Sequence, residues 1–168
     1  MQGYVHAKPS EAAGVLSRLA DCVASIGTYC DSRHLQLNST KTEVMWFGTA
    51  ANLQKMEVKD RRLPVRGVMV EPVEVVRNLG VYFDSRLTMQ QHVSNISRTC
   101  FYHLRRLRSL RKQIGREPVA RLVSAFVLLR LDYCNAIFAG LPSSTLAPLQ
   151  RVQNAAARLV LDLKCETI

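Results

Sequence analysis

The sequence "VSNISRTCFYHLRRLRSLRKQI", residues 93–114, decides the fold of the second half of the chain. Its apolar residues recur at steps of three and four, as on one face of a helix: Val93, Ile96, Cys100, Leu104, Leu107 and Ile114. Arg98, Arg105 and Lys112 recur every seventh residue along one flank of that helix, with Arg108 beside them. The pattern therefore predicts a helix that buries one side and carries a basic ridge.

Two further helices are predicted behind this one. Gly115 ends the first, and Pro118 suits the first turn of a second, which continues to Gly140. This second segment is apolar nearly all round, so we expect it to be the buried central helix. The third helix follows the break at residues 141–144 and has an apolar face: Leu146, Leu149, Val152, Ala156, Leu159 and Leu163. Short connections between three such helices predict a small all-α bundle.

The first half of the chain mixes helix and strand patterns. A helix is predicted from Pro9 to about Cys30, followed by a strand, turn and strand in "LQLNSTKTEVMWFG", residues 35–48. Residues 49–90 stay strand-like, with Pro64 and Pro72 typical of edge strands or hairpin ends. Gly80 interrupts the last run and indicates a bulge or a close approach of another backbone or a ligand. The predicted fold class is α+β.

The positive charge is concentrated in the second half. The 168 residues carry a formal net charge of +10, yet residues 1–60 are balanced, with six basic and six acidic side chains. Residues 86–130 contain ten basic side chains and one acid, Glu117, and residues 86–116 contain no acid. A merely solvated helix face usually mixes both signs of charge. The imbalance favours a polyanionic partner, most often a nucleic acid.

The sequence lacks the residues that are characteristic of several other classes of protein. Five cysteines without a CxxC pair, and four histidines without ligand-like spacing, predict neither disulfides nor a metal site in this chain. No paired acids and no glycine-rich phosphate loop occur, and Ser109 to Lys112 matches an SxxK pattern that chance alone explains. Without a membrane-length apolar run or signal peptide, we expect a soluble intracellular protein, cytoplasmic or nuclear.

Four ordered blocks of the sequence closely resemble a known family. They are "LQLNSTKTEVMWFG" (35–48), "VRNLGVYFDSRLTMQQHVSNI" (76–96), "FYHLRRLRSLRKQI" (101–114) and "AFVLLRLDYCNAIFAGLPSSTLAPLQRVQNAAARLVL" (125–161). Together they resemble the downstream part of the reverse transcriptase, an RNA-directed DNA polymerase, of non-LTR (LINE-type, jockey-like) retrotransposons. The resemblance covers practically the whole chain.

This resemblance implies an organisation and a set of roles. Residues 1–60 would be the end of the palm with its motif D, in which Lys41 would protonate the departing pyrophosphate. Residues 61–90 would hold the primer-grip hairpin, with Leu79 and Gly80 near the 3′ end of the primer. Residues 91–168 would form the helical thumb. Its Arg98, Arg105, Arg108 and Lys112 would follow the template–primer phosphates, in agreement with the charge pattern.

The same resemblance places the catalytic centre outside this chain. The family's Tyr-X-Asp-Asp aspartates bind two divalent metal ions, Mg²⁺ in the parent enzyme, and a segment similar to residues 1–6 directly follows that motif. We therefore expect the aspartates upstream of Met1, with no cofactor bound by this chain and no nucleotide addition by it alone. The expected partners are a template–primer duplex and the missing palm and fingers.

Two other interpretations stay open at this point. The chain could be a standalone basic helical module that binds nucleic acid or a protein partner and has no polymerase role. It could also be a non-functional relic of a decayed element, with exposed apolar faces that make it aggregate. Cooperative thermal unfolding would favour the module, whereas binding of a hydrophobic dye with loss of fixed packing would favour the relic.

Overall fold

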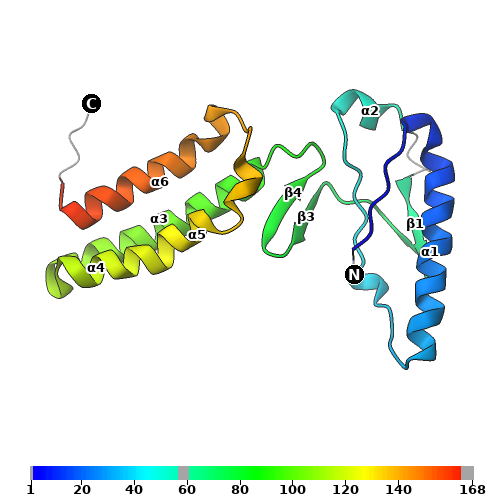
Figure 1. Ribbon diagram of the computed structural model, residues 1–168, viewed down its shortest axis with the longest axis horizontal. Coiled ribbons are helices and arrows are strands. Elements are labelled where there is room, and N and C mark those ends of the chain that lie inside the picture. Colours follow the sequence, from blue (N-terminus) through cyan, green and yellow to red (C-terminus); the bar gives the residue numbers. More distant parts are fainter. Residues whose placement is uncertain (1, 57–60, 164–168) are drawn as a thin grey trace. The chain divides into compact units, whose positions relative to one another are not determined.

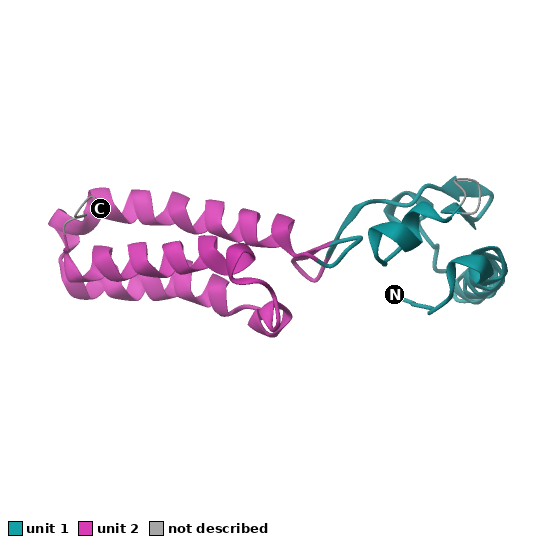
Figure 2. Cartoon of the chain, turned by 90° about the horizontal axis from the view of Figure 1, so that it is seen from above, with its two compact units in different colours: residues 1–77, 84–87 teal, residues 78–83, 88–168 magenta. Residues whose placement is uncertain are grey.

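The computed structural model describes residues 2–56 and 61–163, and this part of the chain is α+β. It divides into two compact units, shown in different colours in Figure 2. The first unit comprises residues 1–77 and 84–87, and the second comprises residues 78–83 and 88–168. The expected boundary at residue 60 lies outside the described residues, and the division into palm, hairpin and thumb stays a prediction.

The first unit is built on one long helix. A short 3₁₀ segment, η1 (Pro9–Glu11), leads into α1 (Ala12–Ser32), as the sequence predicts. The helix buries Leu16 against Leu63 and Val65, and partly buried side chains, Trp46 among them, complete this small core. The Nε1–H of Trp46 donates to the carbonyl of Arg61, at 3.1 Å, so the indole closes the core without an unpaired donor.

The two strands predicted within residues 35–48 are absent from the structure. Instead, a 3₁₀ turn, η2 (Ser39–Lys41), occupies the middle of the segment, and Val44 forms only an isolated parallel bridge with Pro72. The side-chain oxygen of Asn38 accepts the N–H of Thr40 at 2.9 Å, which closes the turn locally. Because the flanking residues find no continuous partner strand, no ladder forms beyond that bridge. A short helix, α2 (Ala50–Gln54), follows.

Two antiparallel hairpins occupy the region from 61 to 90. In the first, β1 (Leu63–Val65) pairs with β2 (Val68–Val70) in the register Leu63 to Val70. Pro64 lies inside β1, where a two-stranded sheet leaves one side of each strand without a partner and therefore tolerates a missing N–H. The prediction that this proline marks an edge strand is confirmed.

The second hairpin corrects the interpretation of Gly80. β3 (Val75–Asn78) and β4 (Val81–Asp84) pair with each other, and only Leu79 and Gly80 separate them. Both residues have left-handed backbones, with φ of 47° and 86°, the requirement of a type I′ turn. Gly80 is therefore the second turn residue of a tight hairpin rather than a bulge within one strand.

The second unit is a bundle of helices, which Figure 1 shows from the side, along the lengths of α3 and α6. Its elements are α3 (Gln90–Ile114), α4 (Arg116–Val123), the π-helical η4 (Ser124–Leu128), α5 (Leu129–Asp132), the 3₁₀ segment η5 (Asn135–Phe138) and α6 (Ser143–Leu161). The expected helices at 93–114 and after residue 142 are confirmed. The expected thumb residues 164–168 lie outside the described residues.

The middle helical segment differs from its prediction in two ways. It ends at Asp132 rather than near Gly140, and it buries one face instead of its whole circumference. Val119, Val123, Val127 and Leu131 face the core, while Leu129 is 63% exposed. Residues spaced by four drift about 40° per step around a regular α-helix. The wider π turn of η4 offsets part of this drift, which keeps Val127 and Leu131 on the core side.

A matched pair of leucines in this segment tests the one-sided burial. Leu131→Ala removes a side chain that is only 8% exposed, and we expect it to lower the unfolding free energy by about 2–5 kcal/mol. Leu129→Ala, two residues away, should change it by less than about 0.5 kcal/mol. Denaturant unfolding monitored by circular dichroism measures both. Equal losses from the two variants would mean that the helix is buried all round.

Candidate nucleic-acid interface

The basic ridge lies on α3, away from the core of the bundle. Its members are Arg98, Arg105, Arg108 and Lys112, and all four are exposed, whereas Cys100, Leu104 and Leu107 on the same helix are buried. None of the four forms a hydrogen bond or ion pair with another residue that the structure describes. Four unpaired cations within four helical turns repel one another and attract an anion.

Neighbouring basic residues on α3 are used differently. The guanidinium of Arg111 donates to the carbonyls of Leu159 and Val160, at 3.3 and 3.4 Å, and so caps the C-terminal end of α6. Arg106 donates to the hydroxyl of Tyr102 at 2.7 Å and lies over its ring. The sequence does not give these partners, because they depend on which side chains and which helix pack beside each arginine.

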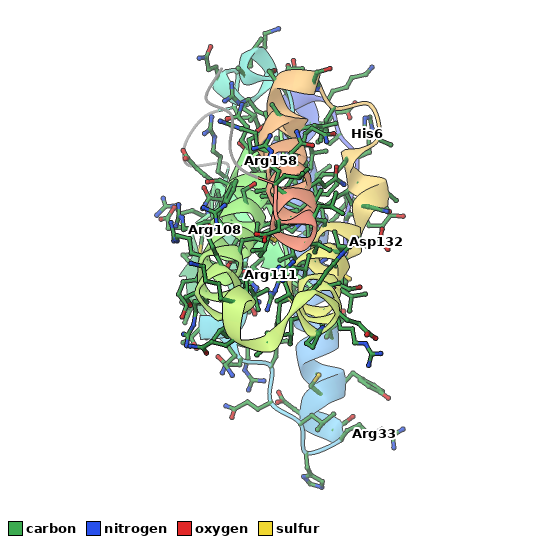
Figure 3. The ribbon with its side chains drawn as sticks, turned by 90° about the vertical axis from the view of Figure 1, so that its left-hand side faces the viewer. His6, Arg33, Arg108, Arg111, Asp132 and Arg158 are labelled. Carbon is green, nitrogen blue, oxygen red and sulfur yellow. The ribbon has the colours of Figure 1, made fainter. Side chains whose placement is uncertain are left out.

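Helix α6 adds basic residues that the sequence analysis did not single out. Arg151 and Arg158 stand seven residues apart on α6, and Arg151 shares a surface groove with residues of α3. Figure 3 shows Arg108 and Arg158 on these neighbouring helices, with Asp132 on the far side of the bundle. The seven-residue spacing was the available signal, but only the packing of α6 against α3 makes it relevant.

The tip of the second hairpin is also exposed. Leu79 is 82% exposed, and its backbone is left-handed, which is costly for a residue with a Cβ. The hydroxyl of Tyr133, just past α5, donates to the Leu79 carbonyl at 2.6 Å. A Cβ on Gly80 would stand 3.6 Å from the Tyr133 ring. The predicted pair therefore sits at a tip that an aromatic ring supports.

His92 packs behind the same hairpin. It is buried at the start of α3, where the backbone N–H of Tyr82 lies 3.5 Å from Nδ1 and the Phe138 ring stacks at 5.8 Å. Because an N–H faces Nδ1, the proton of the neutral ring sits on Nε2, which has no hydrogen-bond partner. Burial lowers the pKa of His92 below its ordinary value.

Lys41 belongs to the first unit, whereas the other predicted site residues belong to the second. It ends η2 in the first unit with an exposed side chain, and it forms no ion pair with a described residue. Among residues 2–56 and 61–163, no three His, Cys, Asp or Glu side chains gather closely enough to hold a metal ion. The role of Lys41 as a proton donor remains a prediction from the resemblance.

Comparison with models of protein families, with characterised proteins and with solved structures finds no match to this chain. Within the part of the chain that the structure describes, no helix combines the length and apolar composition needed to cross a membrane.

Tyr133→Phe tests the support of the hairpin tip. The change removes the hydroxyl that donates to Leu79 while keeping the ring, so the hairpin should open more easily by about 0.5–1.5 kcal/mol. Hydrogen exchange of the amides between 75 and 84 should accelerate by about three- to tenfold. Tyr102→Phe loses a hydroxyl of similar kind on α3 and should leave these amides unchanged. Equal exchange in the two variants would contradict the support.

Acidification tests the burial of His92. Below about pH 6.5 the unfolded chain takes up a proton that the folded chain resists, so stability falls as the pH drops. The pKa of His103 is also lowered, by burial and then by Arg130 and Arg106, so both residues contribute. Denaturant unfolding near pH 7.5 and near pH 5.5 should show a smaller loss for His92→Gln than for the original chain. A loss unchanged in His92→Gln would refute this role.

Proposed function

We propose that this chain is the downstream palm and thumb segment of a non-LTR retrotransposon reverse transcriptase, and that its second unit binds the phosphate backbone of a nucleic-acid duplex. The observation that carries the binding proposal is the ridge on α3: four exposed cations without partners among the described residues, in a stretch without acids. Arginine suits this task because its planar fork can donate two hydrogen bonds to one phosphate.

The expected binding is electrostatic and independent of base sequence. Phosphate contacts release condensed counterions, so affinity falls as salt rises, with a slope of about 0.9 per neutralised phosphate. The contacts proposed for the ridge are to phosphates, which position a protein on a duplex but carry no sequence information. Leu79 and Gly80 at the tip, on this proposal, would lie against the primer backbone, and Lys41 would act only beside a complete palm.

Nucleotide addition is not proposed for this chain alone. On the resemblance, the aspartates that would hold two Mg²⁺ ions lie upstream of Met1. The reading frame ahead of Met1 tests that part of the proposal. A frame that encodes Tyr-X-Asp-Asp directly before Met1 would support a polymerase origin. Its absence would remove the polymerase assignment and leave duplex binding to stand or fall separately.

A protein partner is the second candidate, supported by a different surface. The side of η4 and α5 away from the core exposes Phe126, Leu128 and Leu129, each of which is between 42% and 63% exposed. Apolar side chains in such proximity are typical of contact surfaces. If the chain does not bind a duplex but forms a tight complex with a protein through these residues, the standalone module is favoured.

Removal of the ridge charges tests the proposed function. The quadruple variant Arg98→Gln, Arg105→Gln, Arg108→Gln and Lys112→Gln should bind a short RNA–DNA duplex at least about a hundredfold more weakly at low salt. Its salt slope should fall by about three to four. A control with the same loss of charge, Arg18→Gln, Arg33→Gln, Lys55→Gln and Arg121→Gln, should keep most of the affinity.

Fluorescence anisotropy at several salt concentrations measures both variants. If the two quadruple variants weaken binding equally, net charge alone explains it and the ridge is not the interface. If the original chain does not bind the duplex at low salt, the proposed function is wrong. All eight substituted side chains are exposed, so we expect both variants to remain helical, and circular dichroism checks this.

A further inference from the structure

A groove of about 510 Å³ runs between the first halves of α3 and α6. The two helices run in the same direction, since Arg111 near the end of α3 caps the end of α6. The start of each helix therefore borders the same end of the groove. Its lining residues are Gln90, Val93, Ser94, Ser97, Phe101, Ser144, Thr145, Pro148 and Arg151.

The polar side chains of this lining are suited to an anion. Four carry hydroxyls, one is the guanidinium of Arg151, and no carboxylate lines the groove. The first N–H groups of a helix have no intrahelical acceptor and carry a partial positive charge. On α6, the N–H groups of Thr145 and Leu146 both go to Pro142, so those of Ser143 and Ser144 remain without an acceptor in the helix.

Ser97 gives a second, independent indication of a ligand. Only 7% of this residue is exposed, and its Oγ is buried without any hydrogen-bond partner. Buried hydroxyls are normally satisfied, so an orphan in the wall of a groove points to an acceptor that arrives from outside. Two other hydroxyls of α3 do find acceptors: Ser109 donates to the carbonyl of Arg106 and Thr99 to that of Asn95.

The groove is continuous with the basic ridge. On α3, the residues 90, 94, 97 and 101 that line the groove continue at steps of three and four to Arg105, Arg108 and Lys112. On α6, the positions 144, 148 and 151 continue in the same way to 155 and Arg158. One track of hydroxyls and arginines thus follows the junction of the two helices.

We propose that this groove binds a phosphate group of a nucleic-acid backbone at the end of that track. The inference rests on the proposed function and adds α6 to the interface. The hydroxyl of Ser97 donates to one phosphate oxygen, and Arg151 donates to the others across the groove mouth. The charged oxygens of a phosphodiester only accept hydrogen bonds, which suits a lining in which hydroxyls, amides and a guanidinium can all donate.

The substitution Ser97→Ala separates a binding role from a structural one. Without ligand it removes an unsatisfied buried group, so the melting temperature of the chain should stay equal or rise. With a short RNA–DNA duplex the affinity should fall about tenfold, because a hydrogen bond to a charged oxygen is lost. Arg151→Gln should weaken binding similarly. Ser109→Ala, whose hydroxyl already has an acceptor on α3, is the matched control and should bind as the original chain does.

Small phosphates locate the site directly. Titration of the full chain with dimethyl phosphate at constant ionic strength, followed by NMR, should shift the amides of Ser94, Ser97, Ser144 and Thr145. Dimethyl phosphate mimics the diester of the backbone, and inorganic phosphate serves as the free-ion comparison. Shifts with the diester mimic, absent in Ser97→Ala, support the backbone assignment. Shifts with inorganic phosphate alone would overturn it, because the groove would then hold a free ion.

The outcomes for the groove and for the ridge are distinguishable. Duplex binding that is lost in the ridge variant but unchanged in Ser97→Ala and Arg151→Gln would overturn the groove and leave the proposed function standing. Absence of duplex binding by the original chain would overturn both. A lower melting temperature of Ser97→Ala without ligand would also count against the groove, because it would show that the hydroxyl stabilises the folded chain.

Discussion

The buried stripe of α3 is the constraint on which the second unit depends. The stripe runs through Val93, Cys100, Leu104 and Leu107, and residues of α4, η4 and α6 join it in one apolar cluster. Burial of each such side chain contributes about 1.5–3 kcal/mol, so the helix cannot rotate without losing much of the core. The fixed orientation of α3 in turn places the basic ridge in water, where four like charges are tolerable because solvent screens them.

The same core determines where the hairpin tip is held. Val127 and Leu131 keep to the core across the π turn of η4, and the chain leaves α5 at Tyr133. The Tyr133 hydroxyl then reaches the carbonyl of Leu79, so the hairpin tip is attached to the bundle through the end of a helix. His92, at the start of α3, packs between the hairpin and η5. Packing of the helices thus sets the geometry of a turn that precedes them in sequence.

Charge and hydroxyl groups have complementary places along the junction of α3 and α6. The first turns of both helices contribute hydroxyls and partial positive charge from the backbone, and the later turns contribute full charges on arginines. Where α6 ends, Arg111 turns inward and neutralises the exposed carbonyls of its last turn. One helix thereby uses similar side chains both to hold its neighbour and, on our proposal, to face an anion.

The sequence by itself determined three of the helices, α1, α3 and α6, and the location of the ridge. Apolar steps of three and four depend only on the geometry of one helix, so α1, α3 and α6 and the exposure of Arg98 and Arg105 could be predicted. Strands within 35–48 were wrong because a strand needs a partner elsewhere in the chain, and Val44 meets only Pro72. The roles of Lys41, Leu79 and Gly80 stay predictions from a resemblance.

Tertiary structure alone decided which side chains meet across elements. Periodicity places Arg111 on the buried stripe, four residues after Leu107, and Arg108 beside the stripe. It does not name the neighbouring helix, so the contact of Arg111 with the end of α6 could not be predicted. Ser97 and Arg151 are 54 positions apart in the sequence, as are Leu79 and Tyr133, whose contact the structure forms. The groove, the unsatisfied hydroxyl and the supported hairpin tip all follow from the packing of distant segments, and no local pattern contains that information.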